Sequence, residues 1–314
     1  MYNGPRRSCV RNCTAQEAMN MNDRKSKTDT TQDKRGNMQK IKLEKNSVQE
    51  TLIIPLYARK KCSDKFPQLY TDPMASAICE RIDYDFSLLE RQYESTAYEF
   101  GAMECALRQM DMMWEINDYL KEYPDAAIVC MGCGLDFDPR RCGGVTNTIY
   151  NLDFPDVIAA REELADTDTR EVNIACDLTD LSWMDRVDGK RGAVFYAAGV
   201  FHYLKTEDVK RIALAIVERF PTARVVFDTV GKMGYKLMMK VALKKHGIND
   251  FGELFYTGNP VKDLSAWSDK LRVSARGYML GYYDMKTPGV RAIHRLLAKL
   301  GDSVMKMKIV RLEC

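Results

Sequence analysis

Two different rhythms of hydrophobic and polar positions divide the chain. The first part follows a helical period, in which apolar residues return every three or four positions. Residues 71–82 form one such stretch, with Asp72 as its N-cap and Pro73 at its first helical position. A second helical stretch covers residues 103–122 and stops before a proline. We therefore predict helices up to about residue 122.

Beyond residue 125 the pattern changes to short, continuous apolar runs, which are typical of buried parallel strands. These runs cover residues 126–132, 147–154, 171–178, 192–201 and 223–230. Between the last two runs, residues 206–220 carry an apolar stripe and an acidic first turn, which predicts an amphipathic helix. Strands that alternate with helices form a parallel sheet covered on both faces, so we predict an α/β fold.

The remaining segments complete a one-domain organisation. Residues 1–46 are polar and without a period, so we expect a disordered tail that precedes a single domain over residues 47–314. Residues 47–122 are the helical lead-in, and residues 232–270 interrupt the strand rhythm as an inserted helical cap. Two further strand-like runs, residues 272–284 and 303–314, flank a helix near residues 288–300.

Composition and charge exclude several classes of protein. The 314 residues are 46% hydrophobic and 29% charged, as in globular proteins. The excess of positive charge lies in residues 1–50, and the rest of the chain is slightly acidic. Because nucleic-acid binding needs a concentrated basic face, we expect none. The chain shows no run of 18 apolar residues and no apolar leader, so we expect a cytoplasmic protein that is neither membrane-bound nor secreted.

The ten cysteines are scattered along the chain, which favours free thiols in a reducing compartment. Cys130 and Cys133 form a CxxC pair, for which a zinc site and a redox pair are the two chemical alternatives. No second pair follows at zinc-ribbon spacing, so we expect no metal.

Candidate chemistry lies at the ends of successive predicted strands. Gly132 and Gly134 form a GxG turn after the first strand, where a ligand can approach the backbone closely. The second strand ends in Asp153, which can accept two ribose hydroxyls or act as the N-cap of the next helix. The third strand ends in Asp177 and Leu178, a carboxylate for an adenine amino group and an apolar cover for its ring. The third glycine of the dinucleotide fingerprint is missing, which disfavours a nicotinamide cofactor.

The motifs that carry these residues resemble the leucine carboxyl methyltransferase family. The resemblance is strongest to its bacterial branch, typified by the tetracenomycin polyketide O-methyltransferase. The motifs are GCGLDFDPRR (132–141), LDFPDVIAAR (152–161), ACDLTD (175–180) and FYAAGVFHYL (195–204), with IPLYARKK (54–61) and TDP (71–73) in the lead-in. The resemblance covers roughly residues 50–314. It implies a class I methyltransferase, with a Rossmann-like, seven-stranded, mostly parallel sheet, an antiparallel last strand and S-adenosylmethionine as cofactor.

The resemblance also implies roles for individual residues. Gly132, Cys133, Gly134, Asp153, Asp177 and Leu178 would contact the nucleoside side of the cofactor. Arg108 would pair with the methionine carboxylate, and Arg59 or Lys61 would add a second cation there. The alternative for Arg108 is a surface pair with Glu104 or Asp111 on its own helix.

Two positions depart from the family pattern. Family members often carry an acid where this chain has Ala198, so one contact to the methionine amine is lost or is made by backbone. Phe137 and Asp138 stand where the family has Thr-Arg.

The resemblance implies an O-methyltransferase that acts on a small-molecule carboxylate or hydroxyl. A hydroxyl acceptor needs a general base, for which His202 and Tyr203 after the fourth strand are the catalytic candidates. A protein C-terminal carboxyl methyltransferase and a nicotinamide oxidoreductase are the alternatives. We expect the cap and the N-terminal helices to form the acceptor pocket. The sequence does not give the oligomeric state.

Overall fold

Seven strands form a single sheet in the computed structural model, which describes residues 40–42, 48–166, 168–238 and 254–313. The strand order is β3-β2-β1-β4-β5-β7-β6. The strands are β1 (Ala127–Met131), β2 (Ile149–Asp153), β3 (Glu171–Ala175), β4 (Ala193–Ala197), β5 (Arg224–Thr229), β6 (Arg272–Gly277) and β7 (Lys308–Glu313). Neighbouring strands from β3 to β5 are parallel, whereas β7 is antiparallel to both β5 and β6. The predicted α/β class, the seven strands and the antiparallel last strand are confirmed.

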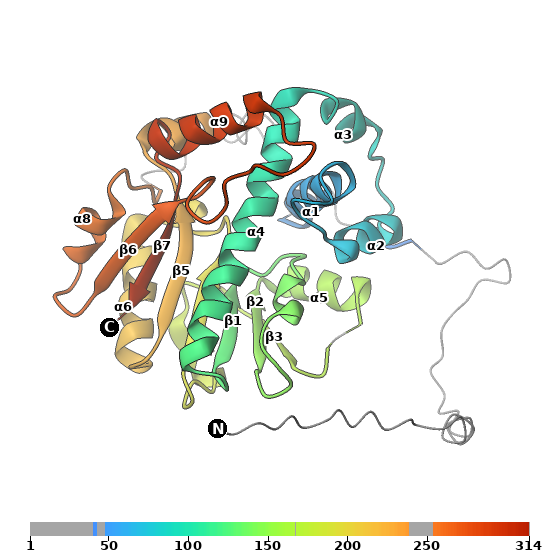
Figure 1. Cartoon of the computed structure of the whole chain (residues 1–314). Helices are drawn as coiled ribbons and strands as arrows, with labels where there is room; N and C mark the ends of the chain where they lie inside the picture. Colours follow the sequence, from blue (N-terminus) through green and yellow to red (C-terminus); the bar gives the residue numbers. More distant parts are fainter. Residues whose placement is uncertain (1–39, 43–47, 167, 239–253, 314) are drawn as a thin grey trace, which may run out of the picture. The chain divides into compact units, whose positions relative to one another are not determined.

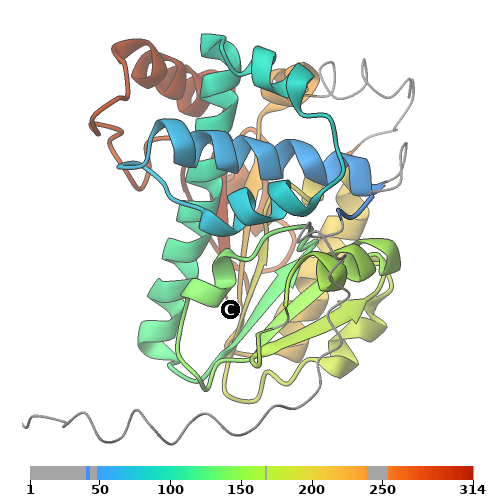
Figure 2. The same ribbon diagram turned by 90° about the vertical axis from the view of Figure 1, so that its right-hand side faces the viewer.

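The order of the strands fixes where a ligand can bind. From β1 the chain moves outward through β2 to β3, and then crosses back to place β4 on the other side of β1. In an open sheet this reversal leaves a crevice at the carboxyl ends of the two strands that flank it. Figures 1 and 2 show the N-terminal helices (blue) beyond one end of β1 to β3. Leu52 of α1 (Val48–Lys65) lies beside the glycine turn after β1, which identifies this as the carboxyl end.

Helices cover both faces of the sheet (Figure 1). Besides α1, the helices are α2 (Pro73–Arg81), α3 (Ser87–Gln92), α4 (Thr96–Glu122), α5 (Pro155–Leu164), α6 (Thr206–Arg219), α8 (Pro260–Ser265) and α9 (Ala292–Ser303). As predicted, Asp72 caps α2, and its side chain accepts a hydrogen bond from Ala75 N–H. In the described part of the chain, no helix combines the length and apolar character needed to cross a membrane.

The core has two layers because side chains alternate along each strand. Ile128 and Cys130 of β1 pack with the layer that contains α1, α4 and α5. Val129 and Met131 pack with the opposite layer, which contains α6. The continuous apolar run of β1 is therefore explained by burial on both faces.

The structure differs from the sequence prediction at the tail and at the insertion. Residues 1–39 and 43–46 of the predicted tail lie outside the described residues. Ile41, however, pairs with Ile82 in a parallel bridge and packs against the core, so part of the predicted tail belongs to the fold. Burial of its apolar side chain against the core favours this position of Ile41.

The predicted cap, residues 232–270, lies partly outside the described residues. Residues 232–238 are helical, and residues 239–253 lie outside the described residues. Phe255, in contrast, is a core residue that packs against Phe227 and Trp267. The second half of the insertion therefore covers the α6 face of the sheet and does not form a lid there.

Candidate functional site

The glycine turn after β1 is shaped by close contacts on both sides. Gly132 has a φ of +73°, and a β-carbon there would lie 2.5 Å from Val200, so only glycine is compatible with the turn. The N–H of Gly134 donates a hydrogen bond of 2.7 Å to the Asp153 carboxylate. The structure thus brings the ends of β1, β2 and β4 together.

Asp153 keeps acceptor capacity in this position. One carboxylate oxygen accepts the Gly134 N–H, and the other accepts the N–H of Phe154 at 2.8 Å. A carboxylate has about four acceptor positions, so two remain for a pair of vicinal hydroxyls. Burial raises the pKa of Asp153, and the two amide donors partly offset this effect. The alternative role as N-cap is not observed, because Phe154 occupies that position.

Asp177 and Leu178 follow β3 but differ in accessibility. Asp177 is exposed, and one of its oxygens accepts both the N–H and the hydroxyl of Thr179 at 2.8 Å. Leu178 is buried in the α6 layer of the core, and its carbonyl accepts the Trp183 indole N–H. Asp177 is therefore oriented for an external donor, whereas Leu178 anchors the loop behind it.

The second predicted cation has a different role. Arg59 is buried, and its Nε donates to Asp72 at 2.9 Å while its Nη2 donates to the Leu135 carbonyl at 2.7 Å. Arg59 thus ties α1 to the loop after the glycine turn and is not a free cation. Its alternative, Lys61, pairs with Glu90 on α3.

A second buried arginine, which the sequence analysis did not predict, also holds the loop after the glycine turn. Arg161, the last residue of the LDFPDVIAAR motif, is buried and donates to the carbonyls of Gly134 and Asp136. It also pairs with Glu171 at 2.9 Å and stacks on Phe137, with 3.8 Å from its guanidinium carbon to the ring centroid. The aromatic ring that departs from the family pattern therefore packs against this arginine.

Arg108 projects from α4 toward the carboxyl end of β4. Gly199, with a φ of +72°, accommodates it, because a β-carbon at that position would lie 2.5 Å from Arg108 Nη1. The ion pair of Arg108 is with Asp228 at 3.5 Å and not with Glu104 or Asp111, so the surface-pair alternative is wrong. Because Gly199 precedes Val200, which touches Gly132, Arg108 belongs to the same site as the glycine turn.

Asp228 is a site residue that the sequence analysis did not identify. It lies near the end of β5, is 4% exposed, and accepts the Gly199 N–H at 2.6 Å. Burial alone would raise the pKa of Asp228, but Arg108 and the hydrogen bond from His202 outweigh this and hold it well below its usual value. The available signal was one acid inside the otherwise apolar run 223–230.

The two predicted catalytic residues occupy different environments. His202 is 3% exposed, and its Nε2 lies 3.1 Å from Asp228. Because an ionised carboxylate only accepts, this nitrogen carries the proton. Tyr203 is 57% exposed. His202 is thus held within the protein, whereas Tyr203 is accessible to an acceptor. Ala198, which precedes Gly199, is half-buried and offers no side-chain donor or acceptor.

The CxxC pair has no thiolate chemistry in this fold. Cys130 lies on β1, and Cys133 lies in the glycine turn with its side chain buried. Burial raises the pKa of both thiols, which keeps them protonated. Within the described residues, no group of three metal-binding side chains is found.

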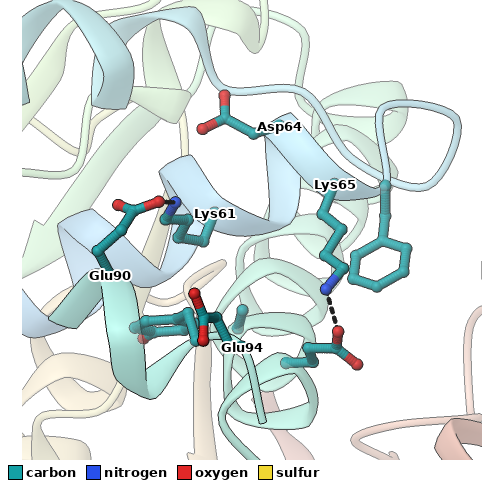
Figure 3. Close-up of a pocket in the computed structure, with 9 residues that line it drawn as sticks. Lys61, Asp64, Lys65, Glu90 and Glu94 are labelled. Carbon is teal, nitrogen blue, oxygen red and sulfur yellow. Dashed lines mark hydrogen bonds and ion pairs between the residues drawn. The ribbon is translucent and has the colours of Figure 1, made fainter. Parts of the chain in front are cut away.

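Two surface cavities lie outside this site. One has a volume of about 330 Å³ and is lined by α1, α3 and α4 (Figure 3). Both lysines that line it form ion pairs with lining glutamates, Lys61 with Glu90 and Lys65 with Glu99, whereas Asp64 pairs with Lys60 outside the lining. The other, about 380 Å³, is lined by residues that include Asp138, Arg141 and Tyr283. The predicted cofactor residues other than Lys61 line neither cavity.

Comparison with known proteins gives a family match. The family model described as leucine carboxyl methyltransferase matches residues 53–217. Tetracenomycin polyketide synthesis O-methyltransferase TcmP from Streptomyces glaucescens is 30% identical over 185 residues, which cover 58% of this chain and 66%, just under two thirds, of TcmP. The S-adenosyl-L-methionine-dependent methyltransferase dpfgK from Gibberella zeae is 24% identical over 264 residues, which cover 78% of this chain and 87% of dpfgK.

A solved structure supports the fold independently. The crystal structure of a DUF574 family protein from Streptomyces avermitilis aligns with a TM-score of 0.57 and 12% identity. The alignment covers 84% of this chain and 96% of that chain. At this identity the likeness concerns the arrangement of helices and strands alone.

Proposed function

We infer the function from one premise, namely that the chain belongs to the leucine carboxyl methyltransferase family and is an S-adenosylmethionine-dependent methyltransferase. The family and the cofactor predicted from the motifs are thereby confirmed. We propose that this enzyme transfers the methyl group to an oxygen of a small molecule, with a carboxylate as the acceptor that the geometry supports best. The observation that carries the proposal is the burial of His202, the histidine candidate for a general base, with its Nε2 in contact with Asp228.

The residues at the strand ends fit the methyl donor. The two open acceptor positions of Asp153 suit the ribose hydroxyls, and the exposed Asp177 suits the adenine amino group. Arg108 Nε is buried without a hydrogen-bond partner among the described residues, so its guanidinium retains a donor for the methionine carboxylate. When bound, S-adenosylmethionine supplies a methyl group already activated by the sulfonium charge.

The chain itself positions the acceptor and excludes water. A carboxylate is ionised at neutral pH and needs no base, whereas a hydroxyl does. His202 is buried with its Nε2 proton directed at Asp228, and a tyrosine hydroxyl such as that of Tyr203 is protonated at neutral pH. Among the described residues, the site therefore offers Tyr203 as a hydrogen-bond donor to an acceptor oxygen, while His202 is buried and cannot act as an accessible base. Proximity and orientation then account for most of the rate enhancement.

The acceptor class can be tested with labelled methyl donor. We would incubate the enzyme with deuterated-methyl S-adenosylmethionine, a panel of aromatic carboxylic acids and phenols, and a peptide with a C-terminal leucine. Mass spectrometry should detect methyl esters of the acids, which mild base hydrolyses, and no base-stable methyl ethers. Base-stable ethers would show that the acceptor is a hydroxyl, and methylation of the peptide alone would show that the acceptor is a protein terminus.

We expect Asp153→Asn to weaken the binding of S-adenosylhomocysteine by about 1.5–3 kcal/mol, because hydrogen bonds to a charged acceptor are replaced by neutral ones. Isothermal titration calorimetry measures this loss directly. Glu163 is exposed on α5, and Glu163→Gln also replaces a carboxylate with an amide. This variant is the matched control and should leave the affinity unchanged. An unchanged affinity in folded Asp153→Asn would place the ribose elsewhere.

A further inference from the structure

The strongest unexplained feature of the site is the group of charges around Asp228. Arg108 reaches it only at 3.5 Å, a long contact for an ion pair. Its Nε finds no hydrogen-bond partner among the described residues. His202 Nδ1 is also buried without a partner in the described part of the chain. Buried polar atoms normally have hydrogen-bond partners, so two unpartnered atoms beside the same carboxylate indicate a ligand-binding position.

The chemistry of this position is that of a zwitterion. A guanidinium and a carboxylate lie side by side, and an imidazole that donates through Nε2 can accept a hydrogen bond at Nδ1. An α-amino acid carries one carboxylate and one ammonium on the same carbon. The carboxylate matches the free donors of Arg108, and the ammonium matches the acceptors of Asp228 and His202.

We propose that Asp228 binds the ammonium group of the methionine part of S-adenosylmethionine. In this exchange the donor's carboxylate takes over Arg108, and the donor's ammonium takes over the oxygen of Asp228 that Arg108 contacts. The net charge of the buried group is the same before and after, which avoids leaving an unpaired buried charge. The proposal rests on the proposed methyltransferase function and deepens it.

The position of Asp228 explains how the chain binds the amine without an acid at position 198. Gly199 N–H already holds one oxygen of Asp228 at 2.6 Å, so the carboxylate is fixed at the loop that begins with Ala198. The acid thus comes from β5, the strand that pairs with β4, instead of from β4 itself. His202 positions the same carboxylate by donating to it through Nε2, and its Nδ1 remains an acceptor for the ammonium.

Ligands that lack one charge at a time provide the test. We would measure by calorimetry the affinity of the full-length protein for S-adenosylhomocysteine, its decarboxylated form, its deaminated form and methylthioadenosine, which lacks the amino-acid part. In Asp228→Asn we expect a loss of about 10- to 100-fold for the two ligands that carry the ammonium. The deaminated form and methylthioadenosine should bind as they bind to the wild-type protein.

Arg108→Gln should show the complementary pattern, losing affinity for the two ligands that carry the carboxylate. If Asp228→Asn does not fold, Arg108→Gln still provides an independent test with the same four ligands. Glu122→Gln, at an exposed position at the end of α4, removes one negative charge away from Arg108 and is the control, which should change none of the four affinities.

The outcomes separate the proposal from its premise. Equal losses for all four ligands in Asp228→Asn would mean that Asp228 only supports the fold and would overturn the proposal. The same conclusion follows if removing the ammonium costs the wild-type protein nothing. If the wild-type protein binds neither S-adenosylhomocysteine nor methylthioadenosine, the proposed function itself fails.

Discussion

Replacing Arg161 with methionine is expected to lower the free energy of unfolding by about 3–5 kcal/mol, the usual cost of removing one partner of a buried ion pair. Methionine retains much of the apolar stem but leaves the carbonyls of Gly134 and Asp136 without their donor. Glu171 is also left with a buried carboxylate oxygen that loses a 2.9 Å partner. Urea unfolding monitored by circular dichroism measures the change.

Arg140→Met is the matched control for this experiment. Arg140 pairs with the same Glu171 and stacks on the same Phe137, but it makes no hydrogen bond to the glycine turn and is more exposed. We expect Arg140→Met to lower the free energy of unfolding by less than half as much as Arg161→Met does. Equal effects would show that the Glu171 ion pair determines the stability and that the bracing of the glycine turn does not.

The second large effect concerns a buried carboxyl group on α4. Asp111 on α4 is 1% exposed, and neither of its oxygens has a hydrogen-bond partner among the described residues. Burial, and then the neighbouring Asp302, raise the pKa of Asp111 to about 9. The unfolded chain releases this proton near pH 4, so wild-type stability falls as the pH rises from about 4 to 9.

Asp111→Asn removes this pH dependence, because an amide does not ionise. We expect the free energy of unfolding of the variant, relative to that of the wild-type protein, to increase by about 2–4 kcal/mol between pH 5 and pH 8. The upper limit is about 1.4 kcal/mol per pH unit. Urea unfolding of both proteins at the two pH values measures the gap. A gap that stays constant would mean that Asp111 is ionised in the folded protein.

Asp118→Asn, on the same helix, should change stability in the opposite direction. Although burial acts to raise the pKa of Asp118, its hydrogen bond and ion pair with Arg224 lower it overall. Its ionised form therefore stabilises the fold above the unfolded pKa, and this contribution is lost as the pH falls through the folded pKa. The variant should be less stable than the wild-type protein at pH 8 and should approach it in acid.

The sheet could be predicted from the sequence because buried parallel strands leave a local signal. Each of the first five apolar runs contains a strand, displaced by a few residues at most. The run 192–201 was too long because Gly199, in a left-handed conformation, turns the chain toward Arg108 after β4 ends at Ala197. Apolarity alone did not reveal this turn, since the residues on both sides of it are hydrophobic.

The sequence predicted which site residues meet only where they directly follow successive strands of the sheet. Gly132, Gly134 and Asp153 are brought together as expected. The roles of Arg59 and Asp228 depend on partners that are 13 to 120 residues away in the chain, and no local period encodes such contacts. For the same reason the sequence did not reveal that Phe255, inside the predicted cap of residues 232–270, packs in the core.

The strand order also determines when each strand finds its pairing partner during translation. β6 has β7 as its sheet neighbour, and β7 is made roughly 30 residues later, about 2–6 s at ordinary translation rates. The five parallel strands can pair as they leave the ribosome, whereas β6 has no sheet neighbour until β7 is made, and until then β5 is an open edge of the sheet. Nascent chains stalled between β6 and β7 should therefore be the species most in need of chaperones.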